Sequence, residues 1–171
     1  YHGYNIQKSL HEENVEHLIR EILAFSFKNN CRLVLPIDVV TADKISGRAD
    51  IQESNVENIK EQNMILDIGK NTLKLIKNEI SKSKTVFWNG PLGVFETSPF
   101  DRGTLEIANF IGALTENNKI RSFAGGGDTI SALDLARVKD KFSYVSTGGG
   151  ALLELIEGKK LPGLVALGIL K

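Results

Sequence analysis

The stretch that decides the fold is Ser122-Phe123-Ala124-Gly125-Gly126-Gly127-Asp128-Thr129, in which an apolar run leads through three glycines into a helix-like segment. A second stretch, Tyr144-Val145-Ser146-Thr147-Gly148-Gly149-Gly150-Ala151, repeats this pattern. Glycine has no Cβ, so such a turn lets the main chain approach a ligand closely and direct its amides at it. A strand, a glycine turn and a helix in succession favour an anion, above all phosphate. Two of these turns predict a polyphosphate and hence a nucleotide, although each can also be interpreted as a plain strand-to-helix turn.

The rest of the chain alternates short apolar runs with helix-like segments. Ser9 and Glu12 form a capping box before a helix that extends to about Lys28, and the polar segment 43–61 is interpreted as a surface excursion. Strands are expected at 33–35, 64–68, 85–88, 121–124 and 142–146. One helix is expected after Ile68, another after Asp128, and two more at about 101–114 and 150–156. This alternation predicts an α/β fold with a parallel sheet and helices on both faces. Ligands gather at the carboxyl ends of such strands, where Asn89-Gly90 and both glycine triplets are expected.

Composition limits the partners of this chain. Its 171 residues fit one domain, and 21 Lys and Arg balance 21 Asp and Glu, so no basic field predicts a nucleic-acid or membrane partner. The single cysteine, Cys31, excludes an internal disulfide and suits a reducing cytoplasm. No run approaches the length of a membrane span, and the polar start is unlike a signal peptide. A chain that begins at Tyr1 leads us to expect that a preceding segment has been removed.

Three motifs occur in order: Asn89-Gly90-Pro91-Leu92-Gly93-Val94-Phe95-Glu96, Gly125-Gly126-Gly127-Asp128-Thr129 and Ser146-Thr147-Gly148-Gly149-Gly150-Ala151. Together they closely resemble the nucleotide-binding domain of phosphoglycerate kinase, and the segments 35–44 and 152–163 match that family as well. The resemblance implies reversible phosphoryl transfer between 1,3-bisphosphoglycerate and Mg-ADP in glycolysis. It also implies a protein of two Rossmann-like domains joined by a hinge, of which this chain is the carboxyl-terminal, nucleotide-binding one.

The resemblance also implies roles for individual residues. Asp128 would be the Mg²⁺ ligand, Asn89 would donate to the nucleotide phosphates, and Glu96 would accept from the ribose hydroxyls. The glycines that would stabilise the phosphoryl group in flight are Gly126, Gly127, Gly148, Gly149 and Gly150. The residues implied to contact ADP or ATP are Leu10, Leu66, Asn89, Gly90, Pro91, Val94, Glu96, Gly126, Gly127, Asp128, Thr129 and Thr147, of which Leu10, Leu66, Pro91 and Val94 would form apolar walls.

Each of these side chains also has a structural interpretation. Asp128 could be a helix N-cap, Asn89 a turn residue and Glu96 a solvated carboxylate. Leu10, Leu66 and Val94 are simply core residues unless a base lies against them.

The chain departs from the family in two ways. About half of the family's chain is missing, including the domain that grips the phosphoglycerate and the Gly-Gly-Ala-Lys segment whose lysines help to hold the phosphates. The sheet would therefore have exposed edges and apolar faces that invite self-association, although a full-length member is expected to be a monomer. Ile65, Lys70 and Gln7 replace residues usual in the family, and we expect these changes to alter the shape of the adenine pocket more than that of the phosphate site. We expect the parent protein to be a phosphoglycerate kinase and this piece alone to be inactive, because it cannot hold the acceptor in line.

Other nucleotide-binding classes fit less well. Neither triplet has the Gly-x-Gly-x-x-Gly spacing of a nicotinamide-binding oxidoreductase, and no P-loop sequence is present. A non-catalytic nucleotide-binding or interaction module stays open as the alternative to an enzyme.

Overall fold

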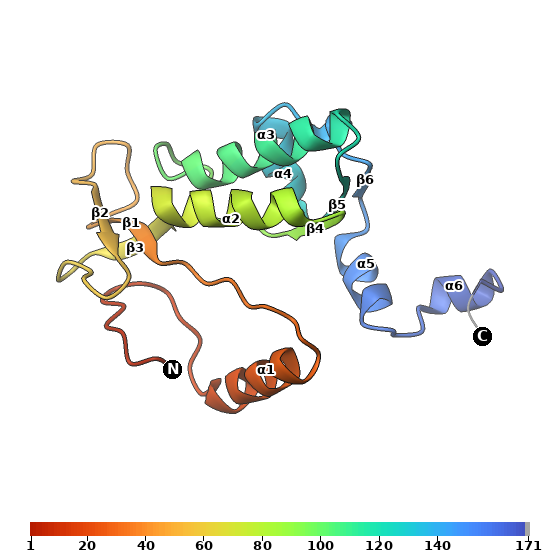
Figure 1. Ribbon diagram of the computed structural model, residues 1–171, viewed down its shortest axis with the longest axis horizontal. Coiled ribbons are helices and arrows are strands. Elements are labelled where there is room, and N and C mark those ends of the chain that lie inside the picture. The colour runs from red at the N-terminus through yellow and green to blue at the C-terminus, as the bar shows by residue number, and fades with distance from the viewer. Residues whose placement is uncertain (170–171) are drawn as a thin grey trace. The chain divides into compact units, whose positions relative to one another are not determined.

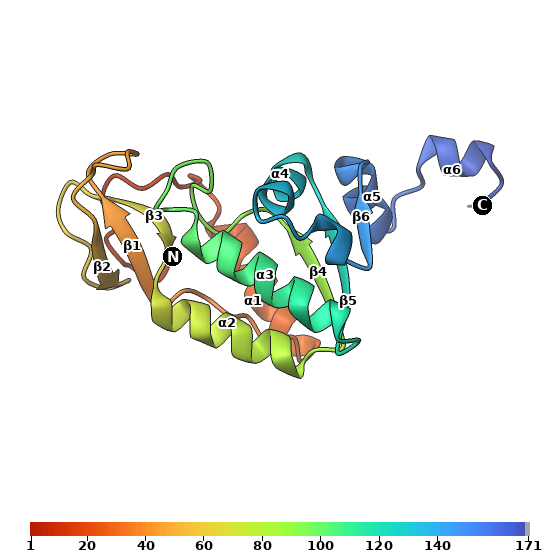
Figure 2. The same cartoon turned by 90° about the horizontal axis from the view of Figure 1, so that it is seen from above.

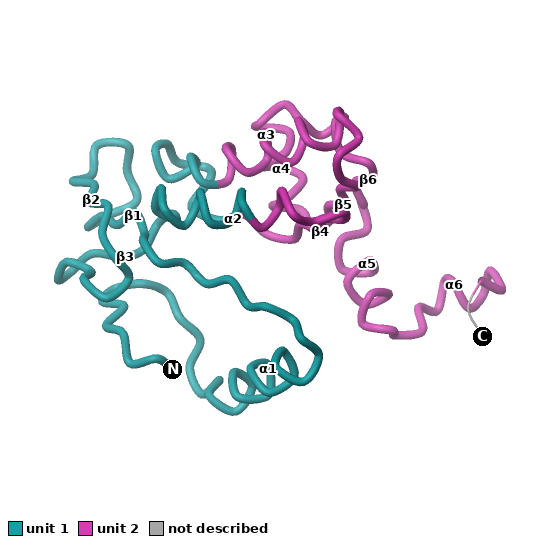
Figure 3. The backbone as a smooth tube through the Cα atoms, viewed as in Figure 1, with its two compact units in different colours: residues 1–78, 92–103 teal, residues 79–91, 104–171 magenta. Residues whose placement is uncertain are grey.

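An antiparallel and a parallel sheet form the centres of two separate units of the chain (Figure 3). The computed structural model describes residues 1–169. Unit 1 comprises Tyr1–Asn78 and Leu92–Gly103, and unit 2 comprises Glu79–Pro91 and Thr104–Lys171.

Unit 1 is built on a three-stranded sheet of β1 (Asp38–Ala42), β2 (Gln52–Asn55) and β3 (Met64–Ile68) in the order β2-β1-β3 (Figure 1). Both neighbours of β1 are antiparallel to it. The buried core of this unit joins Ala42, Leu66 and Phe100. Burying this apolar surface provides the main stabilisation of the unit.

The predicted strand at 33–35 is wrong, and so is the expectation that 64–68 belongs to a parallel sheet. Residues 33–35 adopt no regular structure, and the strand begins after Pro36, at Asp38. The strand at 64–68 exists as β3 but pairs antiparallel with β1. The segment 43–61, which was expected to be irregular, contains the strand β2. This strand was not predicted because Gln52-Glu53-Ser54-Asn55 has no apolar residue.

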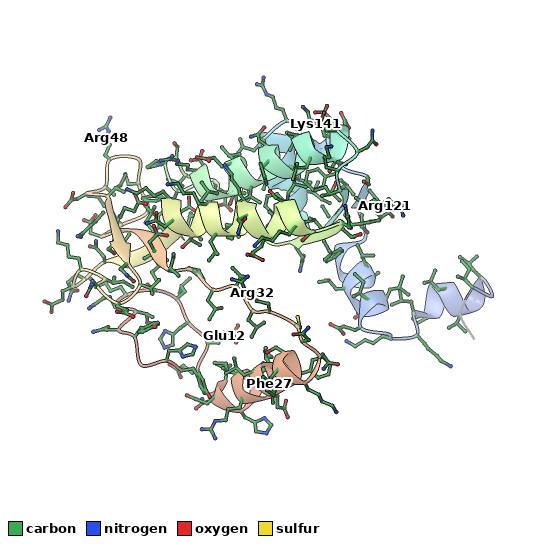
Figure 4. All side chains as sticks on the ribbon, viewed as in Figure 1. Glu12, Phe27, Arg32, Arg48, Arg121 and Lys141 are labelled. Atoms are coloured by element: carbon green, nitrogen blue, oxygen red, sulfur yellow. The ribbon has the colours of Figure 1, made fainter. Side chains whose placement is uncertain are left out.

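The predicted first helix is present as α1 (Glu16–Lys28), but it begins later than the capping box predicts. The capping box is wrong: Glu12 lies on the segment that leads to α1 (Figure 4), and Val15 occupies the N-cap. Ser9 instead accepts a hydrogen bond at its hydroxyl oxygen from the Ile65 amide, at 2.9 Å, which fixes the start of the chain to β3. The helix buries none of its residues within unit 1, and its apolar side chains Leu18, Ile22, Phe25 and Phe27 are exposed.

The helix predicted after Ile68 is confirmed as α2 (Lys70–Lys82), and its start is capped by carboxylates from the sheet. Glu53 of β2 accepts from the first amide of the helix at 2.7 Å. Asp38 of β1 accepts from the amides of Asn71 and Thr72 at 2.9 and 2.6 Å and from the Thr72 hydroxyl at 2.6 Å. These acceptors satisfy amides that have no partner inside a helix and place negative charge at the positive end of its dipole.

Replacing Asp38 by alanine is expected to destabilise the fold by about 2 kcal/mol, because buried helix amides lose their acceptor. Burial alone would raise the pKa of Asp38, but the hydrogen bonds from Thr72 and Asn71 outweigh it and hold the pKa below its usual value. The stabilisation is therefore complete above about pH 4 and is lost as the pH falls through the lowered pKa. Urea unfolding at pH 7 and at acid pH measures both effects. Asp50→Ala, which removes a largely exposed carboxylate, is the matched control, and an equal loss in both variants would contradict the cap.

Unit 2 is built on a parallel sheet of β4 (Thr85–Asn89), β5 (Arg121–Gly125) and β6 (Tyr144–Ser146), in the order β4-β5-β6. The strands predicted at 85–88 and 121–124 are confirmed, and the one predicted at 142–146 is shorter than expected. Three predicted helices are confirmed: α3 (Arg102–Glu116, which begins in unit 1), α4 (Gly127–Leu135) and α5 (Gly149–Ile156). Two short elements were not predicted: the 3₁₀ helix Lys139–Lys141 and α6 (Pro162–Ala166).

Helices lie on both faces of the parallel sheet. Ser122 hydrogen-bonds Thr115 of α3 at 2.8 Å, whereas Gly125, three residues along the strand and hence on the other face, lies against Leu152 of α5. In Figure 1, α3 and α5 lie on opposite sides of β5. The face that α5 reaches is covered only in part, since Phe87 is 40% and Tyr144 is 55% exposed.

No helix within residues 1–169 is both long enough and apolar enough to cross a membrane.

Candidate functional site

The carboxyl ends of the three parallel strands meet at one edge of unit 2 (Figure 2). Asn89 at the end of β4 is in register with Gly125 at the end of β5, and Gly125 is in register with Ser146 at the end of β6. Asn89 and the starts of both glycine triplets therefore lie side by side, as the sequence predicts. At this edge of a parallel sheet, main-chain amides and helix starts face the same space.

The first glycine turn brings the chain from β5 into α4. Gly126 is the N-cap of α4 and has a φ of +97°, a conformation that favours glycine. A Cβ added at Gly126 would lie 2.7 Å from the Oδ1 atom of Asn89, so the turn is also tight against the neighbouring strand. Because Gly126 holds the N-cap, Asp128 does not, and the interpretation of Asp128 as an N-cap is wrong.

The second glycine turn is packed against the first. A Cβ added at Gly149 would lie 2.5 Å from the amide nitrogen and 2.6 Å from the Cα of Gly126. Main chain thus contacts main chain between two turns that are far apart in the sequence, and only glycine leaves room for it. Gly150 has open space where its Cβ would be.

The starts of α4 and α5 have no side-chain cap, in contrast with the starts of α2 and α3. The first amides of each helix have no partner inside the helix, and no carboxylate from the described residues replaces one. Two uncapped helix starts, placed together by the Gly126–Gly149 contact, form a positive, amide-rich edge that suits an anion.

Asp128 lies exposed in the first turn of α4, one residue beyond the start of the helix. In the described part of the chain no group of three or more His, Cys, Asp or Glu side chains could hold a metal ion by itself. A single exposed carboxylate beside an amide-rich edge is compatible with Mg²⁺, which prefers few protein ligands and completes its shell with waters and oxygens of a bound anion.

Thr129 lies in the first turn of α4, and its hydroxyl group has a partner within the protein. Its side chain is only 1% exposed, and its hydroxyl oxygen accepts from the Gly90 amide at 2.7 Å. Gly90 has a φ of +91°, and its carbonyl oxygen accepts from the Trp88 indole. Thr129 therefore fixes the turn after β4 to α4. Thr147 is exposed before α5, and Pro91 is half-buried.

The residues implied for the base and the ribose belong to unit 1, apart from Pro91. Leu66 is buried in the core of that unit, and Val94 packs on the same core and donates its amide to the Leu66 carbonyl at 2.8 Å. Glu96 is exposed two residues further along. Leu10 is fully exposed and stands apart from this core.

Sequence reasoning missed Asp67, an aspartate in the otherwise apolar strand β3. It is 2% exposed, and its carboxylate accepts from the amides of Ile68 and Gly103 at 2.8 and 2.7 Å. Burial raises the pKa of Asp67 to about 6, against the lowering effect of these two hydrogen bonds. The sequence does contain a signal for this residue: Asp67 is the only charged residue in the run Met64-Ile65-Leu66-Asp67-Ile68. Because buried charges are rare and need partners, such a position indicates a specific role.

Comparison with known proteins shows which family the sequence of this chain resembles. The sequence profile of the phosphoglycerate kinase family matches residues 1–159. The phosphoglycerate kinases of Xanthobacter flavus and of a Chelativorans species are 43% and 42% identical to the chain over 165 residues, which is 96% of this chain. The chain spans 42% of the length of each of these relatives.

Solved structures give the same result. The phosphoglycerate kinase of Coxiella burnetii matches 92% of this chain with a TM-score of 0.85 at 38% identity, and the match covers 40% of that structure. The enzyme of Pyrococcus horikoshii matches 98% of the chain with a TM-score of 0.67 at 27% identity. A family match over most of the chain and relatives above 40% identity lead to one conclusion: the chain belongs to the phosphoglycerate kinase family.

Proposed function

We propose that this chain is the carboxyl-terminal, nucleotide-binding part of a phosphoglycerate kinase and that its glycine-rich edge binds the phosphates of Mg-ADP and Mg-ATP. The observation that carries this proposal is the contact between Gly149 and the main chain of Gly126. It brings two uncapped helix starts to one end of a parallel sheet, where they can share a chain of phosphates.

The chemistry needs positioning and charge neutralisation more than covalent participation. A phosphoryl group in transfer spreads negative charge over its oxygens, and fixed amides at Gly126, Gly127 and Gly148 to Gly150 match that charge without reorganising. Mg²⁺, held by Asp128, would neutralise the phosphate oxygens on the nucleotide side. Asn89 ends β4 in register with Gly125, and we propose that its side-chain amide donates to the phosphates.

The base and the ribose of the nucleotide are assigned to Leu66, Pro91, Val94 and Glu96. Leu66 is buried, so we propose that it does not contact the base directly but supports Val94, which packs against the same core. The exposed Leu10 contributes an apolar surface only if it folds onto the ligand. Ile65 donates its amide to Ser9 and so links this region to the start of the chain.

Phosphoglycerate would be held by the part of the enzyme that lies outside this chain, since the chain spans 42% of its relatives. We therefore expect no 3-phosphoglycerate-dependent ATP turnover from the 171 residues alone. A coupled assay checks this expectation, and turnover above a mock preparation would overturn it. The whole enzyme is proposed to act in the cytoplasm as a monomer, and the isolated chain, with Phe87 and Tyr144 exposed, is proposed to self-associate.

The function is tested by calorimetric titration of the folded chain with Mg-ADP. We expect saturable binding, one nucleotide per chain, with inorganic phosphate competing only weakly. Absence of binding by a sample that circular dichroism shows to be folded would overturn the proposed site. Equal binding of a nicotinamide dinucleotide would instead favour the oxidoreductase class.

A further inference from the structure

A buried carboxylate joins the strand below Val94 to the segment that carries Val94 and Glu96. Asp67 of β3 accepts from the amide of Gly103, the second residue of α3, at 2.7 Å through one oxygen. Its other oxygen accepts from Ile68 at 2.8 Å. No residue in the first turn of α3 is acidic, so the acceptor for the start of this helix comes from the sheet.

Two glycines fit around this carboxylate. A Cβ added at Gly93 would lie 2.5 Å from the Asp67 Oδ1 atom and 2.5 Å from the carbonyl oxygen of Phe100. A Cβ at Gly103 would also meet Asp67. The segment 92–103 therefore closes over Asp67 at both of its ends, and the neighbouring amide of Val94 pairs with Leu66.

We propose that Asp67 is a positioning residue for adenosine recognition: its carboxylate fixes the segment 92–103 on β3 and thereby sets the positions of Val94 and Glu96. The inference rests on the proposed function, because it assumes that these two residues contact the base and the ribose. Asp67 itself is too deeply buried to touch the ligand.

This arrangement makes the segment sensitive to protons. Asp67 lines one small pocket with Glu53 of β2, Lys70 of α2 and Arg102 of α3. The charges of Asp101 and Arg102 also act on its carboxylate, Asp101 raising its pKa and Arg102 lowering it. Burial, opposed by the hydrogen bonds from Gly103 and Ile68, raises the pKa of Asp67 to about 6. A proton converts one acceptor oxygen into a donor, so one of the two amides loses its partner.

Protonation of Asp67 is expected to stabilise the folded chain, not to unfold it. The pKa is raised in the folded state, so the folded state binds the proton more tightly than the unfolded state does, and this group stabilises the fold increasingly as the pH falls through about 6. A loss of ligand affinity in this range therefore reports on the segment and not on global stability.

The test is an NMR titration of the chain with adenosine, which has no phosphate, between pH 7.5 and pH 5. We expect the affinity of the wild type for adenosine to fall about fivefold as the pH falls from 7.5 to 5, because about fivefold corresponds to the free energy of one ordinary hydrogen bond. Asp67→Asn is expected to bind about fivefold more weakly at pH 7.5 and to show no further change. Asp50→Asn, the same substitution at a largely exposed position, is expected to follow the wild type. The amide signals of Gly103 and Ile68 are expected to titrate together near pH 6 in the wild type.

The outcomes separate the two proposals. If the chain binds Mg-ADP but Asp67→Asn matches the wild type in affinity and pH profile, the positioning role is wrong and the nucleotide site stands. If the folded wild type binds neither Mg-ADP nor adenosine, the proposed function fails and the positioning role fails with it. If Asp67→Asn does not fold, the wild type alone provides the test. An adenosine affinity that does not change between pH 7.5 and pH 5, or a Gly103 amide signal that does not titrate near pH 6, overturns the inference.

Discussion

Replacing Gly149 by alanine is expected to weaken Mg-ADP binding about a hundredfold, close to 2.7 kcal/mol. The added Cβ would lie 2.5 Å from the amide nitrogen of Gly126, a main-chain atom that cannot rotate away. The two glycine turns must separate, and the amides of α4 and α5 then no longer point at one ligand. Calorimetry measures the loss of affinity, and circular dichroism is expected to show α5 intact, because alanine favours helix over glycine.

Two further variants test the cause of this loss. Gly163→Ala makes the same substitution in α6, where a Cβ meets nothing, and is expected to bind as the wild type does. Gly126→Ala is expected to act like Gly149→Ala, since it combines a clash with Asn89 and a φ of +97°. Because both glycines belong to one contact, the double variant is expected to lose much less than the sum of the two. Full additivity, or an unaffected Gly149→Ala, would contradict the shared contact.

The parallel sheet of unit 2 was predictable from the sequence because its signals are local. Each of β4, β5 and β6 is a short, largely apolar run that ends in a turn with glycine, and a helix follows directly after the turns of β5 and β6. Strand, turn and helix identity are properties of neighbouring residues, so a single sequence contains them.

Unit 1 was not predictable in the same way, because its organisation depends on contacts between distant residues. β2 has no apolar residue, and its pairing with β1 defines it. The run 33–35 has the composition of a strand, but no strand of the described chain pairs with it. Asp38 caps the start of α2 from 33 and 34 residues before the amides that it accepts from, whereas capping rules consider only adjacent positions.

In the candidate site too, features that depend on neighbouring residues were predictable and features that depend on distant contacts were not. Glycine triplets, an exposed aspartate and their place after strands follow from residue types, and the structure brings Asn89 and both triplets to one edge. The contact between Gly126 and Gly149 and the inward turn of the Thr129 hydroxyl do not follow, because each depends on a partner from another strand. The same holds for Asp67, whose role is visible only when Gly93 and Gly103 are packed around it.

Replacing Asp128 by alanine is expected to weaken Mg-ADP binding about a hundredfold while leaving the weak binding of metal-free ADP unchanged or slightly stronger. The carboxylate is exposed in the first turn of α4, so its removal costs little folding stability beyond its favourable interaction with the helix dipole. Without Mg²⁺ the same carboxylate repels the phosphates, and its loss then relieves repulsion.

The comparison across metal and variant isolates the metal ligand from a general electrostatic effect. Calorimetric titrations with Mg-ADP and with ADP in the presence of a chelator give four affinities for the wild type and Asp128→Ala, and we expect the magnesium-dependent gain to disappear in the variant. Asp134→Ala removes a carboxylate from the last turn of the same helix, where it pairs with Lys139, and is expected to keep that gain. If Asp128→Ala retained the full gain, the metal would be held by other groups and Asp128 would act only on the start of α4. If affinity fell equally with and without Mg²⁺, the variant would have disturbed the amides themselves, and the assignment of the metal to Asp128 would be wrong.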